Sequence, residues 1–123
     1  MRKILISIKP KYVQDILLGK KLYEYRKRLP SDVDAAIIYA TAPVKKIVGE
    51  IKVGGVLSMS PEDLWDKTQL YSGLTKEHFF QYFKGCLVAH ALYIENVVEY
   101  DTPLNLEEMK IKRAPQSWQY LGY

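Results

Sequence analysis

A lysine, a carboxylate and a guanidinium occur close together near the N-terminus, in residues 19–26 (GKKLYEYR). Side chains alternate between the two faces of a strand, so Glu24 and Arg26 are expected on one face and Tyr25 on the other. Lys21 comes at the turn into this strand, and its long side chain can reach either face. These groups could bind a polar ligand or transfer protons. The alternative is a surface salt bridge on a half-exposed strand, which contributes little stability.

The segment before this stretch would hold it in place. Residues 3–8 are rich in isoleucine and leucine and predict a buried strand. Pro10 is typical of the first turn of a helix, and the apolar residues at positions 13, 16 and 17 have helical spacing. Gly19 suits the left-handed residue that ends a helix. A helix of about ten residues is therefore expected, and it leads directly to Lys21.

Further strands and helices are expected downstream. Apolar runs predict strands over Ala35–Ala40, Ile47–Leu57 and Leu87–Val98, with a bulge at Gly54-Gly55. Helices are expected after Ser60 and from Thr75 to Gly85, and a turn at residues 101–103. Trp118, Tyr120 and Leu121 would dock the C-terminal segment. Because strands and helices do not alternate regularly, the sequence predicts an α+β fold. A small, mostly antiparallel barrel with two or three short helices at its ends is expected.

Length and composition limit the class of protein. A chain of 123 residues is expected to form one domain over residues 1–123. It contains no apolar run of about 18 residues, so no membrane association is expected. The lone cysteine, Cys86, is expected to be buried and structural, and a cytoplasmic location is the simplest expectation. The spacing of Asp66, Glu77 and His78 matches no metal-ligand motif, so neither a metal nor a cofactor is expected. The sequence leaves the oligomeric state open.

The charge of the chain is unevenly distributed. Residues 1–28 contain nine basic and two acidic residues and carry a net charge of +7, whereas residues 29–123 carry −3. A basic face of this kind attracts the phosphate backbone of nucleic acids. The alternative is a solvated basic surface that has no partner.

Residues 19–26 resemble the signature of the ASCH domains, which are small barrels related to the PUA-like RNA-binding folds. The segments 4–10 (ILISIKP), 37–43 (IIYATAP) and 46–50 (KIVGE) resemble the family's first strand, its next strand with the following loop, and the strand after that. The resemblance implies a pocket beside the signature that faces RNA or a modified nucleoside. Some members are linked to ribonuclease activity. Smaller members are amidohydrolases that act on acetylated cytidine, and Lys21 matches their catalytic lysine. Glu24 stands where those enzymes have a threonine.

The leading hypothesis is an RNA- or nucleotide-binding module that recognises a base or a modified nucleoside, with Tyr25 or Tyr39 available for stacking. A second hypothesis is a hydrolase that acts on RNA or on an acylated nucleoside, with Lys21 as the base. A third is a regulatory domain that binds a metabolite or a protein. The expected catalytic residues are Lys21, Glu24 and Arg26. The expected ligand-binding residues are Lys9, Lys20, Lys21, Glu24, Arg26, Thr41, Gln116 and Ser117, and Lys9, Lys21, Glu24 and Thr41 are predicted to surround one cleft.

Overall fold

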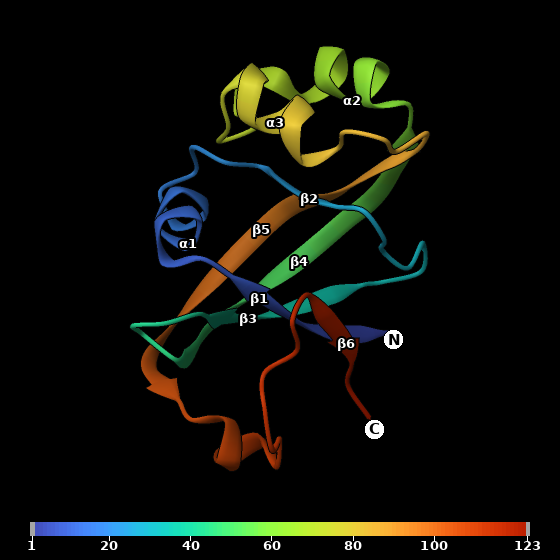
Figure 1. Cartoon of the computed structure of the whole chain (residues 1–123). Helices are drawn as coiled ribbons and strands as arrows, with labels where there is room; N and C mark the ends of the chain where they lie inside the picture. Colours follow the sequence, from blue (N-terminus) through green and yellow to red (C-terminus); the bar gives the residue numbers. More distant parts are fainter. Residues whose placement is uncertain (1, 123) are drawn as a thin grey trace.

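The computed structural model describes residues 2–122, which form a six-stranded sheet curled into a half-barrel together with three α-helices (Figure 1). The strand order is β2-β5-β4-β3-β1-β6. In chain order the elements are β1 (Lys3–Ile8), α1 (Pro10–Leu17), β2 (Tyr23–Arg26), β3 (Ala35–Ala40), β4 (Lys46–Met59), α2 (Pro61–Thr68), the 3-10 helix η1 (Gln69–Tyr71), α3 (Lys76–Tyr82), β5 (Ala89–Leu104), the 3-10 helix η2 (Leu106–Met109) and β6 (Trp118–Tyr120). The predicted α+β class is confirmed.

The strands pair mostly in the antiparallel sense, as predicted. Strands β1 and β3 are parallel, and the other pairs recorded for residues 2–122 are antiparallel. The register between β4 and β5 shifts on both sides of Val53, which confirms a bulge next to Gly54 and Gly55. The predicted turn at residues 101–103 is wrong, because β5 continues to Leu104. Pro103 is tolerated there because β2 pairs only with residues 90–93 of β5, which leaves the far end of β5 without that neighbour.

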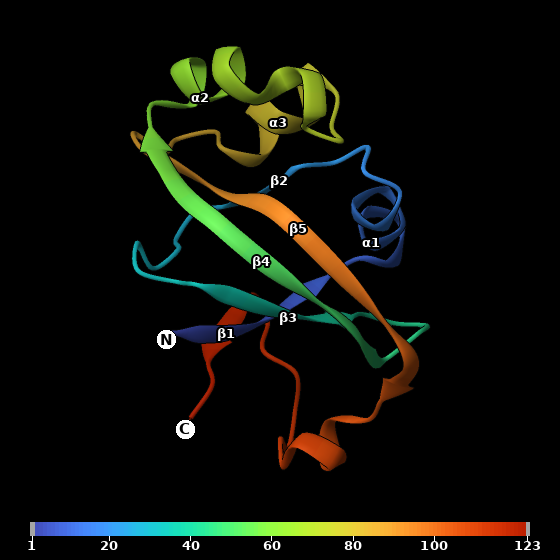
Figure 2. The ribbon, with the colours of Figure 1, turned by 180° about the vertical axis from the view of Figure 1, so that it is seen from behind.

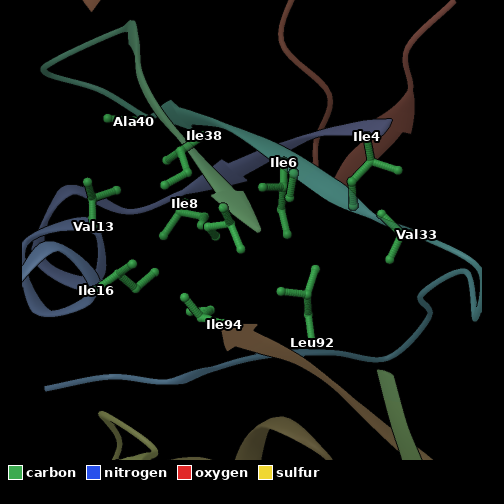
Figure 3. Close-up of a cluster of buried hydrophobic side chains, with 12 residues drawn as sticks. Ile4, Ile6, Ile8, Val13, Ile16, Val33, Ile38, Ala40, Leu92 and Ile94 are labelled. Atoms are coloured by element: carbon green, nitrogen blue, oxygen red, sulfur yellow. The ribbon is translucent and has the colours of Figure 1, made fainter. Parts of the chain in front are cut away.

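Apolar side chains fill the concave side of the sheet beneath α1. Ile4, Ile6 and Ile8 alternate along β1 and point toward Leu92 and Ile94 of β5 (Figure 3). Helix α1 closes this cluster with its apolar stripe, of which Val13 and Ile16 are buried. The helix is anchored directly after β1, so burial of this stripe also fixes where the chain turns back toward β2.

A second core lies at the end of the sheet that carries α2 and α3 (Figures 1 and 2). Its centre is Phe79 of α3, whose ring lies 5.0 Å from the rings of both Trp65 and Tyr25. Both helices begin at the predicted caps: the Ser60 hydroxyl accepts from the Asp63 amide, and the Thr75 hydroxyl accepts from the His78 amide. None of the helices in the described part of the chain is long and apolar enough to cross a membrane.

The C-terminal segment docks on the sheet, as predicted, because β6 pairs with β1. Residues 115–118 also approach the end of β2. The Ser7 hydroxyl donates to the Pro115 carbonyl at 2.7 Å, and the Trp118 indole donates to the Arg28 carbonyl at 2.8 Å. The C-terminal segment therefore lies between β1 and the chain that leaves β2, where the curled sheet would otherwise be open.

Candidate functional site

A cavity of about 380 Å³ lies where the ends of β1 and β2 meet α1, α3 and the C-terminal segment. The structure brings seven of the predicted site residues to its wall: Lys9, Lys21, Glu24, Arg26, Thr41, Gln116 and Ser117. Lys20 is exposed and is not part of this wall, although its neighbour Lys21 is 1% exposed. The role of Lys20 in binding RNA or a ligand therefore stays a prediction, and it would be exerted outside the cavity.

The turn after α1 places Lys21 in the interior. Gly19 has φ +76°, the left-handed conformation that ends a helix, and the amides of Lys20 and Lys21 both donate to the Asp15 carbonyl. The aliphatic part of Lys21 then passes under Gly73, which has φ +72°. A Cβ atom at position 73 would lie 2.7 Å from the Lys21 Cδ atom, so the close approach requires glycine.

The ammonium group of Lys21 is held by several partners. It donates to the Ser72 carbonyl at 2.5 Å and lies 3.6 Å from Oε1 of Glu24. It also lies 5.0 Å from the centre of the Tyr25 ring and 5.3 Å from that of Tyr12, within the range of cation–π attraction. Burial lowers the pKa of Lys21, and the negative charge of Glu24 opposes that shift. The site thus stabilises a lysine that gives up its proton more readily than an exposed one.

Arg26 fixes the other oxygen of Glu24. Its Nη2 lies 2.6 Å from Glu24 Oε2 and also donates to the Ser7 carbonyl at 2.9 Å. Its Nη1 donates to both the carbonyl and the hydroxyl of Ser117, at 3.2 and 3.0 Å. These contacts occupy the terminal N–H groups of the guanidinium, so Arg26 orients Glu24 and ties β2 to β1 and to the C-terminal segment. We call Lys21, Glu24 and Arg26 the buried triad.

Tyrosines and lysines surround the buried triad. The Thr68 hydroxyl donates to the Leu64 carbonyl, so the Tyr25 hydroxyl 2.7 Å away donates to Thr68. Burial raises the pKa of Tyr25 to about 12, and burial also raises the pKa of Tyr12. Two other lysines lie over the tyrosine rings of the cavity wall: Lys11 lies 5.3 Å from the Tyr12 ring, and Lys27 lies 5.2 Å from the Tyr82 ring.

Two predictions about tyrosines need correction. Tyr39, a candidate for base stacking, is 8% exposed and packs in a separate core with Leu5, Ile37 and Ile47. Strand β3 is covered on both faces. Tyr39 lies on the face opposite to that of Ile38, which packs in the core beneath α1, so Tyr39 cannot reach the cavity. Tyr25, the other candidate for base stacking, lines the same cavity as Glu24, but it is 5% exposed and its ring packs edge-on against Phe79 and Phe83, which leaves little of it for a base. The cavity extends around the end of β2 toward α3, which packs on the Tyr25 ring.

Sequence reasoning missed several cavity residues, namely Ser7, Tyr12, Leu74, His78 and Tyr82. One signal was available: His78 and Tyr82 are four residues apart on α3 and therefore share a face of the helix. Nothing in the local sequence indicated that this face would turn toward β2, because the packing of Phe79 and Phe83 in the second core decides that orientation.

The cavity combines features suited to a planar, hydrogen-bonding, anionic ligand. Its volume falls near the lower end of the range of about 300–1,000 Å³ that is usual for small-molecule sites. Glu24 retains lone pairs for donors on a ligand, the tyrosines offer ring faces, and Lys9 supplies an exposed positive charge. Among residues 2–122, no group of three or more His, Cys, Asp or Glu side chains is placed to hold a metal ion.

Comparisons with known proteins agree with this architecture. The family model described as "ASCH domain" matches residues 6–113. The chain is 30% identical over 126 residues to the ASCH domain-containing ribonuclease of Zymomonas mobilis, covering 98% of this chain and 84% of that protein. It is 31% identical over 120 residues to the large ribosomal subunit protein uL22 of Ureaplasma parvum, covering 96% of this chain and 39% of that protein. The chain therefore spans less than half the length of that relative.

The fold is also that of solved structures. The crystal structure of ASCH from Zymomonas mobilis superposes with a TM-score of 0.88 and 28% sequence identity, covering 98% of this chain and 87% of that one. A tyrosine-to-phenylalanine variant of the same protein superposes with a TM-score of 0.89 and 26% identity, covering 99% and 91% of the two chains. These overlaps extend over the strands and helices that build the cavity.

Proposed function

The chain belongs to the ASCH domain family, whose fold is a PUA-like RNA-binding fold, and we propose that its cavity binds one nucleotide of a single-stranded RNA. The observation that carries the proposal is the placement of the buried triad in one cavity with tyrosine rings and lysines at its wall. Sequence-specific recognition of RNA targets unstacked bases, which stack on aromatic rings and hydrogen-bond through their edges.

Each part of the cavity has a role in this proposal. Glu24, held between Lys21 and Arg26, accepts hydrogen bonds from the edge of a base. Tyr12 or Tyr82 stacks on the face of the base, in place of Tyr25 and Tyr39, the tyrosines predicted for this role. Lys9 at the cavity wall contacts a phosphate, and other basic residues of the first quarter of the chain do so outside the cavity. The polar groups of Thr41, Gln116 and Ser117 add hydrogen bonds at the wall.

A matched pair of lysine substitutions tests the location of binding. Lys9 lines the cavity, whereas Lys52 is exposed on β4 and pairs with Glu95. Both Lys9→Ala and Lys52→Ala remove one positive charge. We expect only Lys9→Ala to weaken binding of a short single-stranded RNA in fluorescence anisotropy, and to reduce the slope of log K against log salt by about 0.7. Equal effects of the two substitutions would show that the net charge, and not the cavity, determines binding.

A second candidate function is cleavage of RNA. It is supported by the similarity to a protein named as a ribonuclease and by the burial that lowers the pKa of Lys21. A neutral lysine could accept the proton of a ribose 2′-hydroxyl that attacks the adjacent phosphate. The same lysine could serve as the base for an acylated nucleoside, which was the other substrate class expected for a hydrolase.

The substitution Lys21→Arg distinguishes binding from catalysis. Arginine keeps the positive charge but cannot lose a proton at usable pH. If Lys21 is the base, turnover should fall by about a hundredfold to ten-thousandfold while affinity for an uncleavable 2′-O-methyl RNA changes little. The substrates are single-stranded RNA and N4-acetylcytidine. Turnover that survives Lys21→Arg would exclude this role for Lys21, and the absence of any wild-type turnover would leave the binding function alone.

A further inference from the structure

Helix α3 brings a histidine to the same cavity as the buried triad. His78 is exposed, and it lies one helical turn before Tyr82 on the face that lines the cavity. Figure 1 shows α3 above the end of the sheet where β2 begins. The Thr75 hydroxyl accepts from the backbone amide of His78, so this hydrogen bond does not involve the imidazole.

The other ionisable groups of the cavity are poorly suited to donating a proton. Arg26 does not deprotonate in proteins. Glu24 is engaged by Lys21 and Arg26, and Lys21 is already the base that accepts the other proton in this candidate. The Tyr25 hydroxyl donates to Thr68. The remaining groups on the wall are phenols and an ammonium, which as chemical classes are weaker acids than an imidazolium. Imidazole can both release and accept a proton near neutral pH, so His78 is the best-suited donor on this wall.

Cleavage of RNA through its 2′-hydroxyl requires two proton transfers. The 2′-oxygen loses its proton as it forms a bond to phosphorus, and the P–O5′ bond breaks as the 5′-oxygen leaves with the bonding electron pair and gains a proton. The products are a 2′,3′-cyclic phosphate and a 5′-hydroxyl end. Lys21 accounts only for the first transfer in the cleavage candidate described above.

We propose that His78 is the general acid of this reaction and that its protonated imidazole donates to the leaving 5′-oxygen. The inference rests on the RNA-cleavage candidate and adds the second proton-transfer group. The proton accepted by Lys21 and the one given by His78 balance, so each group returns to its starting state by exchange with solvent. The two groups come from different elements, Lys21 from the turn before β2 and His78 from α3, and both line the one cavity in which the RNA would lie.

The leaving group provides a specific test. In RNA with a bridging sulfur at the 5′ position of the scissile phosphate, the thiolate leaves without protonation. We expect His78→Ala to slow cleavage of ordinary RNA by about a hundredfold to ten-thousandfold, and to change cleavage of the sulfur-substituted RNA only a few-fold. Glu77→Ala, on the same helix but outside the cavity wall, is the matched control and should leave both rates unchanged. His78→Gln should behave like His78→Ala.

Two results would overturn the assignment. Equal losses on both substrates would mean that His78 positions the RNA and does not protonate it. A wild-type protein that cleaves neither substrate would remove both the acid and the cleavage candidate. Anisotropy with 2′-O-methyl RNA separates this failure from that of the binding function, because retained, cavity-dependent binding would leave the RNA-binding proposal standing.

Discussion

The substitution Glu24→Gln removes the negative charge between the buried Lys21 and the partly buried Arg26, and it leaves the shape of the side chain almost unchanged. Glu24 is 5% exposed, with the Lys21 ammonium 3.6 Å from one oxygen and the Arg26 guanidinium 2.6 Å from the other. Glutamine can still accept a hydrogen bond from Arg26, but it does not offset either positive charge. The two cations then face each other in a poorly solvated site.

The size of the effect follows from the distance and the burial. At an effective dielectric constant of about 20, unit charges separated by 3.6 Å attract with an energy of about 4–5 kcal/mol. Removing one partner of a buried ion pair usually costs about 3–5 kcal/mol. Because glutamine retains part of the hydrogen bonding, we expect Glu24→Gln to lower the free energy of unfolding by about 3 kcal/mol at neutral pH.

The cost should decrease as the pH rises. Burial lowers the pKa of Lys21 and Glu24 raises it, so Glu24→Gln lowers the folded-state pKa further. An unfolded chain keeps this lysine protonated up to its ordinary pKa near 10.5, so stability rises with pH between the folded and unfolded pKa values. Once Lys21 is neutral in both proteins, the lost Lys21–Glu24 attraction no longer distinguishes them. The difference in the free energy of unfolding between the wild type and the variant then approaches the contribution of the Glu24–Arg26 contact alone.

Urea unfolding of the wild type and the variant at a series of pH values from 7 to 10 measures this difference. The control is Glu50→Gln, because Glu50 lies at the same 3.6 Å distance from Lys3 in a partly exposed pair. That substitution should cost less than about 1 kcal/mol. A Glu24→Gln cost that equals the control, or that does not change with pH, would refute the argued coupling between Lys21 and Glu24.

Three further predictions concern packing and binding. Gly73→Ala should destabilise the fold by more than Gly85→Ala, since both positions have positive φ but only a Cβ at position 73 would meet Lys21; urea unfolding measures the difference. Tyr12→Ala should weaken RNA binding by about 1–3 kcal/mol in anisotropy, whereas Tyr120→Ala outside the cavity should not. If about four phosphates are contacted, log K should fall with log salt with a slope near −3, and a salt-independent affinity would contradict this.

Much of the fold is encoded in short-range patterns. The predicted strands Lys3–Ile8 and Ala35–Ala40 match β1 and β3, because uninterrupted apolar runs bounded by proline and polar residues leave few alternatives. The helix starts were predictable because Ser60 and Thr75 cap them through their own hydroxyl groups. The end of β5 was not predictable in this way. Pro103 suggests a turn unless the strand is known to lack a neighbour on one side.

The candidate site was predictable only in part, because local patterns do not show which distant segments meet. Lys21, Glu24 and Arg26 lie within six residues, so strand geometry alone brings two of them together. The cavity around them depends on contacts between distant parts of the chain. Tyr12 and His78 reach it because α1 and α3 bury their opposite faces, and Tyr39 is excluded because η2 and the residues after it cover its side of the sheet. No local pattern carries that information.

The buried triad also closes the half-barrel. Strands β2 and β6 are at the two edges of the sheet, and Arg26 spans the opening between them through Ser7 and Ser117. A ligand in the cavity would therefore contact the groups that hold the edges together, so substitutions in the triad should change stability as well as function. Lys9 and His78 are exposed on the cavity wall and take no part in the Arg26 contacts that hold the sheet edges together. Ligand recognition can therefore vary at these two positions without weakening the fold.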